Sequence, residues 1–139
     1  MRIRRAVAEE RESLEELQRR ASLANEDDRE ALLANPDAIE LPAEQIERGE
    51  VFVADSDGHI AGFAALVGGE LDGLFVEPAL WGRGIGRLLV EAAVHEARRK
   101  GLSATVIANP AARTFYEKCG FVVESEAQTR FGPALRMSR

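Results

Sequence analysis

A glycine-rich turn is the part of the sequence whose residue types most directly indicate chemistry. The segment Trp81-Gly82-Arg83-Gly84-Ile85-Gly86 lies between an apolar stretch typical of a strand (residues 70–76) and a helical pattern that begins near Arg87. The first N–H groups of a helix have no partner within it, and together with the helix dipole they bind anions, most often phosphate. Arg83 and Arg87 can add charge-assisted hydrogen bonds. The turn therefore predicts a ligand that carries a pyrophosphate.

Two common nucleotide-binding motifs do not match this turn. A phosphate-binding P-loop requires Lys-Ser or Lys-Thr after its glycines, and neither is present. A dinucleotide-binding fingerprint requires Gly-x-Gly-x-x-Gly and an acidic residue about 20 positions later. Here the spacing is Gly-x-Gly-x-Gly, and the next predicted strand ends at Ala108-Asn109. The ligand is not expected to be a nicotinamide dinucleotide, and the remaining alternative is that the glycines only allow close strand–helix packing.

A second motif follows from Asn109 to Phe121, where Asn109-Pro110 predicts the start of a helix. Asn109, Ala112, Phe115 and Tyr116 are spaced so that they group near one helix face. A small residue at 112 admits an elongated ligand, and the Asn109 amide can pair with peptide-like groups. The hydroxyl of Tyr116, the only tyrosine, can donate a proton to a leaving group. Taken alone, the two aromatic residues would more often belong to a core.

In this order, the two motifs resemble those of the GNAT superfamily of acetyl-CoA-dependent N-acetyltransferases. The family's phosphate-binding signature, Arg/Gln-x-x-Gly-x-Gly/Ala, matches residues 81–86 except that Trp81 replaces Arg or Gln. The later pattern, Asn-x-x-Ala-x-x-Phe-Tyr…Gly-Phe, matches residues 109–121 completely. The resemblance implies an enzyme that moves an acetyl group from acetyl-CoA to a primary amine of a small molecule or peptide. The amine would attack directly while both substrates are bound, without a metal.

The resemblance also implies a role for particular residues. The main-chain amides of residues 82–87 would hold the coenzyme A pyrophosphate. The main-chain edges of Leu74 and Val76 would form hydrogen bonds with the pantetheine arm, which would lie beside them like an added strand. N–H groups near Leu74 and Phe75 would stabilise the oxyanion. Asn109 would contact the pantetheine, and Tyr116 would protonate the departing thiolate. The cofactor-binding residues predicted in this way are Leu74, Phe75, Val76, Gly82, Arg83, Gly84, Ile85, Gly86, Arg87, Asn109, Ala112 and Tyr116.

Two carboxylates are candidates for the general base. An alkyl amine with a pKa near ~10 is protonated at neutral pH and must lose its proton before it attacks. Simple alternation along the predicted strand would place Glu70 and Asp72 on the same face as Leu74. Because an unpaired carboxylate is costly in a buried strand, a wall of the acceptor site explains them better. The alternative is a structural salt bridge, and Glu77 is expected to be a solvated turn residue.

The rest of the sequence predicts an α/β fold in a single N-acetyltransferase domain over residues 1–139. We expect a GNAT-like, mixed but mostly antiparallel sheet with one parallel βαβ crossover and helices on both faces. The βαβ crossover is predicted where a helix connects residues 70–76 to residues 103–108. Expected strands span 3–6, 51–54, 60–67, 70–76, 103–108, a segment from 120, and 128–137, the last broken by Gly132-Pro133. Expected helices span 8–21, 27–34, 42–49, 85–100 and 110–119.

Composition limits the classes of partner. The 139-residue chain has a formal net charge of −6, which argues against a nucleic-acid partner because such proteins carry basic surface. Cys119 is the only cysteine, so no internal disulfide can form, and a buried, inert thiol is expected. No stretch has the length of an apolar membrane span, and we expect a cytoplasmic protein. His59 and His95 lack neighbours at metal-ligand spacing and are expected on the surface.

The acceptor amine is not encoded in any motif. By resemblance, it would be selected by residues 19–45 and 128–137, where Arg19, Arg20, Asn25 and Arg130 are candidate ligands for an acceptor carboxylate or simply exposed polar residues. Two other classes stay open, namely a non-catalytic acyl-CoA-binding regulatory module and a toxin-type acetyltransferase acting on charged tRNA. The negative charge disfavours the latter. A homodimer is expected only from the family.

Overall fold

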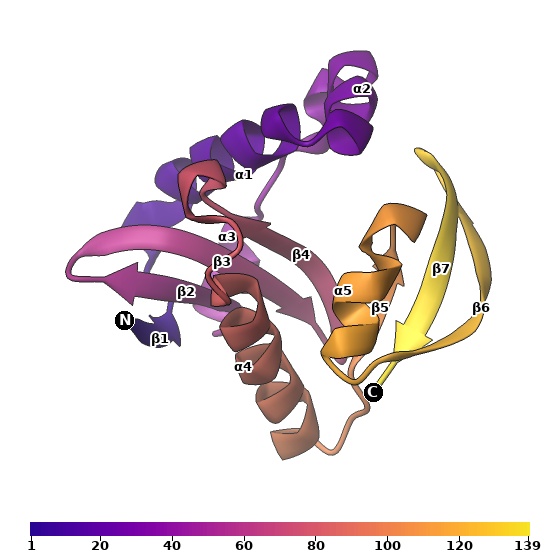
Figure 1. Cartoon of the computed structure of the whole chain (residues 1–139). Coiled ribbons are helices and arrows are strands. Elements are labelled where there is room, and N and C mark those ends of the chain that lie inside the picture. Colours follow the sequence, from indigo (N-terminus) through magenta and orange to yellow (C-terminus); the bar gives the residue numbers. More distant parts are fainter.

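The fold is built on one seven-stranded sheet with the order β1-β2-β3-β4-β5-β7-β6 (Figure 1). The computed structural model describes the backbone of residues 1–139 and every side chain except that of residue 27. Neighbouring strands are antiparallel except β4 and β5, which are parallel and connected by α4. The mixed sheet with one βαβ crossover is therefore confirmed. The strands are β1 (Arg2–Arg5), β2 (Val51–Ser56), β3 (His59–Val67), β4 (Glu70–Val76), β5 (Thr105–Ala108), β6 (Val122–Thr129) and β7 (Gly132–Ser138).

Helices cover both faces of the sheet, as expected (Figure 1). They are α1 (Arg11–Ala24), α2 (Glu26–Ala34), α3 (Ala43–Glu47), α4 (Ile85–Arg99) and α5 (Arg113–Lys118), with single 3-10 turns at Ala8–Glu10, Pro36–Ala38, Pro78–Leu80 and Pro110–Ala112. Leu89, Val90 and Val94 of α4 are fully buried against one face. On the other face, Leu14 and Leu17 of α1 pack with Phe63. No helix in the described part of the chain is long and apolar enough to cross a membrane.

The last strand differs from the prediction. A last strand over residues 128–137, broken at Gly132-Pro133, was expected. Instead residues 128–129 end β6 and β7 begins at Gly132, so that Thr129 pairs with Gly132 across a hairpin. Gly132 has a φ of +111°, a backbone conformation that glycine adopts without strain. The expected helix over residues 110–119 is likewise a 3-10 turn followed by α5.

A β-bulge in β4 sets which way its side chains point. Leu71 pairs with Leu66 and Gly73 with Ala65 of β3, so Asp72 is an extra residue between them. Leu71 and Leu74 consequently both pack in the core on the α4 side, although they are three residues apart. The expectation that Glu70, Asp72 and Leu74 share one face by alternation is therefore wrong.

The pairing of β4 with β5 ends early. Only Glu70 with Thr105 and Leu71 with Val106 are in register, whereas β4 continues to Val76. The two strands diverge beyond these pairs, as the family resemblance implies. The divergence leaves the second half of β4 without a neighbouring strand on that edge.

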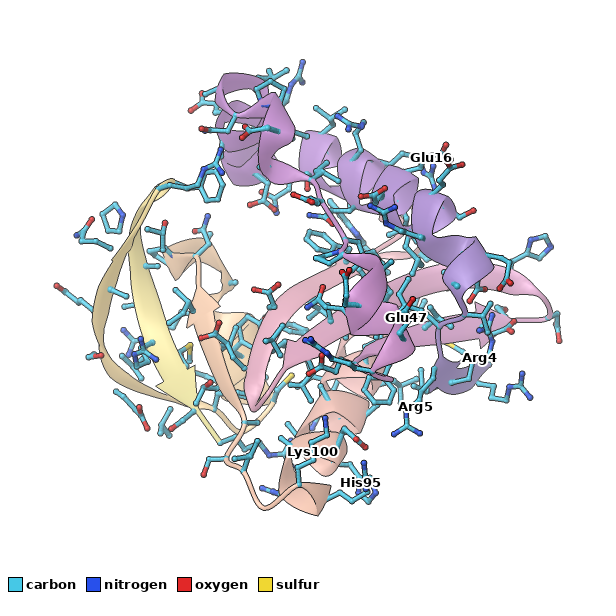
Figure 2. The ribbon with its side chains drawn as sticks, turned by 180° about the vertical axis from the view of Figure 1, so that it is seen from behind. Arg4, Arg5, Glu16, Glu47, His95 and Lys100 are labelled. Atoms are coloured by element: carbon cyan, nitrogen blue, oxygen red, sulfur yellow. The ribbon has the colours of Figure 1, made fainter. Side chains whose placement is uncertain are left out.

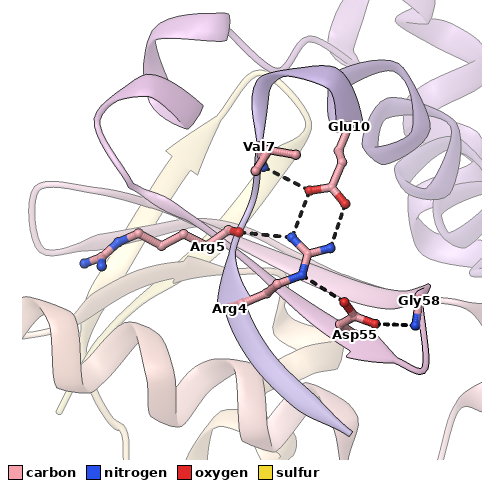
Figure 3. A network of polar contacts seen from close by, with 6 residues as sticks. All are labelled: Arg4, Arg5, Val7, Glu10, Asp55 and Gly58. Atoms are coloured by element: carbon pink, nitrogen blue, oxygen red, sulfur yellow. Dashed lines mark hydrogen bonds and ion pairs between the residues drawn. The ribbon is translucent and has the colours of Figure 1, made fainter.

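An arginine at the other edge of the sheet connects three elements (Figure 3). The Arg4 guanidinium of β1 donates to both oxygens of Glu10, at 3.0 and 2.7 Å, and to Asp55 of β2 at 2.9 Å. Hydrogen bonding to Arg4 is the main reason that the pKa values of both carboxyl groups lie below their usual range. Because Glu10 directly precedes α1, this network fixes the start of α1 relative to the sheet.

A buried carboxylate anchors the C-terminal part of α4. Glu96 is only 4% exposed and accepts hydrogen bonds from Arg99, at 2.6 and 3.0 Å, and from Arg5 at 3.1 Å. The Arg99 hydrogen bond is the largest cause that lowers the pKa of Glu96 from 4.5 to about 2. Since the pKa is lower in the folded chain, these contacts stabilise the fold above pH 4.5, and this contribution is lost as the pH falls towards 2.

Glu96→Gln should therefore lower the free energy of unfolding at pH 7 by about 1–2 kcal/mol, a modest value because the partner arginines are solvent-exposed. The difference from the parent protein should shrink as the pH falls from 5 towards 2, because the parent loses the same interaction on protonation. Urea denaturation of both proteins across this pH range measures the difference in their free energies of unfolding. Glu91→Gln is the control, at an exposed position of the same helix where the carboxylate pairs with Arg139; it should lower the free energy of unfolding less at pH 7 because this pair is more exposed. A pH-independent difference for Glu96→Gln would contradict the interpretation.

Candidate active site

A cavity of about 510 Å³ lies where the second half of β4 meets the N-terminus of α4 and the helix α5. It brings together most of the residues predicted to bind the cofactor. Its lining includes Leu74, Phe75, Val76, Trp81, Gly82, Gly84, Ile85, Gly86, Arg87, Ala112, Phe115 and Tyr116. Two predicted residues are not among them, namely Arg83, which is exposed, and Asn109.

The glycines of the turn serve both anion binding and close packing. Gly82 and Gly84 have φ values of +81° and +82°, and a Cβ atom on either would meet no other atom within 4 Å. Leu88 is bonded to the Gly84 carbonyl, so the N–H groups of residues 85–87 precede the regular helical bonds and are free for an anion. A Cβ on Gly86, in contrast, would lie 3.3 Å from the Phe115 ring. Gly86 therefore allows α4 and α5 to pack closely.

The main chain of β4 presents hydrogen-bonding groups to this cavity. The N–H of Glu77 donates to the Ala61 carbonyl of β3 at 2.8 Å. In an antiparallel ladder, residues bond the neighbouring strand alternately, so the polar groups of Phe75 also face β3. Those of Leu74 and Val76 face the opposite way, into the gap left by β5. Of the two N–H groups expected near the oxyanion, only that of Leu74 therefore faces the gap.

Trp81 has a role that the sequence did not reveal. Its indole Nε1–H donates to the Val76 carbonyl at 2.8 Å, which ties the glycine turn to the end of β4. Thus the residue that replaces the family's Arg or Gln donates a hydrogen bond to a carbonyl group at the open edge of β4. The one sign of this role in the sequence is that the only tryptophan stands at the single position where the chain differs from the family signature.

Tyr116 is buried at the inner end of the first cavity. It is 8% exposed, and its ring contacts those of Phe115 and Phe121 edge-on, with centroids 5.0 and 5.6 Å away. Burial, with a smaller effect of Cys119, raises the pKa of its phenol above the ordinary value of 10.0. The hydroxyl is therefore protonated at neutral pH and able to donate. Cys119 is buried as expected, and burial also raises the pKa of its thiol.

A second cavity, of about 530 Å³, adjoins the first on the side of β4 that faces α1 and α2. Phe75 and Asp28 line both cavities. Asp72 lines the second cavity, whereas Glu70 lines neither cavity. Asn109 also lines the second cavity, and its Oδ1 accepts a hydrogen bond from the Ala111 N–H at 2.9 Å. Its amide NH₂ group is the part left to contact a ligand.

Two of the arginines considered for an acceptor carboxylate are bound to other residues. Arg20 of α1 forms an ion pair with Glu77, whose carboxylate lies 3.2 Å from the Arg20 Nε, so the expectation of a merely solvated Glu77 is wrong. Arg130 at the hairpin tip bonds Asp37 at 3.0 Å and Asn35 at 3.1 Å. His95 points outward from α4 (Figure 2), and the described side chains form no cluster of three potential metal ligands.

The sequence as a whole matches a known family. The model of the acetyltransferase (GNAT) family matches residues 11–121. The chain belongs to this family. It is 35% identical over 131 residues to the peptidyl-lysine N-acetyltransferase YjaB of Salmonella typhimurium, across 91% of this chain and 86% of that relative. Acetyl-CoA is the acetyl donor of this family, and the first cavity contains the phosphate-binding turn that would hold it.

Solved structures share the fold. The apo form of YjaB from Escherichia coli is 28% identical with a TM-score of 0.75, and the match covers 99% of this chain and 95% of the other. The PaiA N-acetyltransferase of Thermoplasma acidophilum, solved with coenzyme A, is 23% identical with a TM-score of 0.75 and covers 99% and 98%. This chain is thus an acetyltransferase with a GNAT fold.

Two glycines of α4 allow a controlled test of the anion site. Gly84 and Gly101 flank the helix, both have left-handed φ values (+82° and +74°), and neither has a neighbour within 4 Å of a built Cβ. Alanine at either position should cost a similar ~1–2 kcal/mol of stability. Only Gly84→Ala should weaken coenzyme A binding, by about tenfold, because its methyl group disturbs amides that bond phosphate. Isothermal calorimetry measures this, and equal losses of affinity in both variants would contradict the assignment.

Proposed function

We propose that this acetyltransferase transfers an acetyl group from acetyl-CoA to a primary amine of a small molecule or peptide by direct attack. The observation that carries the proposal is that the two cavities adjoin at Phe75, in the gap where β4 and β5 stop pairing. One cavity has the glycine turn for a pyrophosphate, and the other has space for an acceptor. Direct transfer requires the two reactants to be in contact, and this arrangement provides it.

The proposed mechanism uses groups on both sides of β4. The pantetheine arm bonds the Leu74 carbonyl and the Val76 N–H, since the Val76 carbonyl is bonded to Trp81, and this places the thioester in the gap. Asp72 removes the proton from the acceptor ammonium, directly or through a water molecule, and the neutral amine attacks the thioester carbon. The Leu74 N–H stabilises the oxyanion of the tetrahedral intermediate. The nitrogen, positively charged after the attack, loses its second proton to solvent as the carbon–sulfur bond breaks. The leaving thiolate takes the proton of the Tyr116 hydroxyl, which solvent then restores.

The relatives support an amine acceptor and extend the range of candidates. YjaB of Salmonella typhimurium is a peptidyl-lysine N-acetyltransferase, which makes a lysine side chain one acceptor to test. We further propose that residues 1–139 act as one such domain, and the homodimer expected from the family stays a prediction. The alternative is an acyl-CoA-binding module without turnover. The position of Tyr116 in the lining of the cofactor cavity favours the enzyme.

A thiol-release assay with acetyl-CoA and a panel of amines, amino acids, polyamines and lysine peptides tests the transferase. Tyr116→Phe should lower kcat by about 10- to 100-fold. The effect is limited because a thiol with a pKa near ~8.5 is a fair leaving group without help. The affinity for acetyl-CoA should not change, because the ring is retained. Binding of coenzyme A without release of thiol for any amine would instead support the binding module.

The base can be identified with a pair of variants on the same strand. Asp72→Asn should lower kcat/KM at pH 7 by about 10²-fold, since the amine then lacks a proton acceptor. Activity should recover as the pH approaches the amine pKa of ~10, where neutral amine is abundant. Glu70→Gln is the control, because Glu70 lines neither cavity. If Glu70→Gln shows the larger loss and the pH-dependent recovery, the assignment is wrong.

A further inference from the structure

The middle of the glycine turn lies in open space. A Cβ atom built on either of its first two glycines meets no other atom within 4 Å. Directly after them, Ile85 is buried in the core at the start of α4. Among the hydrogen bonds of the described residues, the 2.8 Å bond from the Trp81 indole to the Val76 carbonyl is the one that joins residues 81–84 to a strand. The position of the turn relative to β4 is therefore fixed by Ile85 on one side and by Trp81 on the other.

The bond from Trp81 lies between the two parts of the cofactor cavity. On one side are the N–H groups at the start of α4, which suit a pyrophosphate. On the other side are the open main-chain groups of Leu74 and Val76, which suit the pantetheine arm. Coenzyme A contains the pyrophosphate and the pantetheine in one chain, so the distance between turn and strand decides how far along β4 the thioester lies. A misplacement of about 1 Å can cost a large part of the rate.

The indole of Trp81 is suited to fix this distance. Its Nε1–H is a donor without acceptor capacity, so it bonds the Val76 carbonyl and leaves the Val76 N–H to the ligand. An indole has two side-chain torsions, fewer than the Arg or Gln of the family signature, so less conformational freedom is lost when the bond forms. The ring lines the cofactor cavity and is 46% exposed. Removing its N–H should therefore change the ligand site more than the stability of the core.

We propose, granted the proposed function, that Trp81 is a positioning residue that couples the pyrophosphate site to the position of the thioester. The indole holds the turn at one distance from β4. The pantetheine arm then spans a fixed length from the turn to the gap, where the thioester carbonyl meets the Leu74 N–H. Without the indole N–H, each part of coenzyme A still finds its own partners, but the turn and the strand no longer lie at one distance. Coenzyme A must then fix that distance itself on binding, which costs affinity.

The indole N–H can be removed with little other change, because Trp81 is the only tryptophan of the chain. Biosynthetic replacement of tryptophan by benzothienylalanine, in which sulfur takes the place of the N–H, keeps the bicyclic ring and removes the donor. Replacement by 5-fluorotryptophan, which keeps the N–H, is the matched control. Trp81→Phe removes the same donor by mutagenesis and serves as a second variant.

Isothermal calorimetry with two ligands separates a positioning role from a structural one. Coenzyme A would contact both the turn and the strand, whereas adenosine 3′-phosphate 5′-diphosphate contains the pyrophosphate without the pantetheine arm. Loss of the N–H should weaken coenzyme A binding about three- to tenfold, as expected for one hydrogen bond, and leave the affinity for the nucleotide unchanged. The fluorinated protein should bind both ligands as the parent protein does. Equal weakening of both ligands, or no weakening of coenzyme A, would overturn the proposal.

The thiol-release assay gives a second readout, with an amine that supports turnover. With acetyl-CoA, kcat should fall about tenfold in the benzothienylalanine protein, because the thioester is no longer held at the Leu74 N–H. With S-acetylpantetheine, which lacks the phosphates, kcat/KM should be the same as in the parent protein. An equal fall for the two donors would contradict the coupling. If coenzyme A binds but no amine is acetylated, the proposed function fails, and the calorimetric comparison still decides the role of Trp81.

Discussion

The early end of the pairing between β4 and β5 is the constraint on which the rest of the site depends. Two residue pairs hold these strands together, and beyond them the main-chain groups of Leu74 and Val76 have no neighbouring strand. Backbone N–H and C=O groups need partners, and an open strand edge binds extended chains with amide groups. The Trp81 indole satisfies only the Val76 carbonyl. The others are available to a ligand, and under the proposed function the glycine turn at the end of the strand would receive the phosphate groups of that ligand.

The bulge at Asp72 makes one strand serve two cavities. Without the extra residue, alternation would turn Leu71 and Leu74 to opposite faces of the sheet. With it, both pack on the α4 side, while Asp72, Gly73 and Phe75 line the acceptor cavity. Under the proposed mechanism, the oxyanion donor Leu74 and the base Asp72 thus lie two residues apart, and the base lines the second cavity. A bulge next to a reactive centre is a common way to re-aim a side chain.

Local signals in the sequence predicted the parts of the fold that depend on neighbouring residues. The bounds of β4, the glycine turn, the helix that follows it and the crossover were all predicted from apolar periodicity and turn residues. The bulge was not, because it is defined by pairing with β3. The apolar residues Leu71 and Leu74, three apart, were the only hint. The ion pairs of Arg20 with Glu77 and of Arg130 with Asp37 join segments 57 and 93 residues apart, which no local pattern reveals.

Charged side chains are distributed unevenly over the two cavities and the helix that borders the first. The N-terminus of α4 and Arg87 give the first cavity a positive field, which suits a pyrophosphate. The C-terminus of α4, where Glu96 would oppose the helix dipole, is neutralised by Arg5, Arg99 and Lys100. Glu40 and Asp72 are among the residues that line the second cavity. Phe75 lines both cavities, so under the proposed function the acetyl donor and the acceptor would meet where β4 and β5 stop pairing.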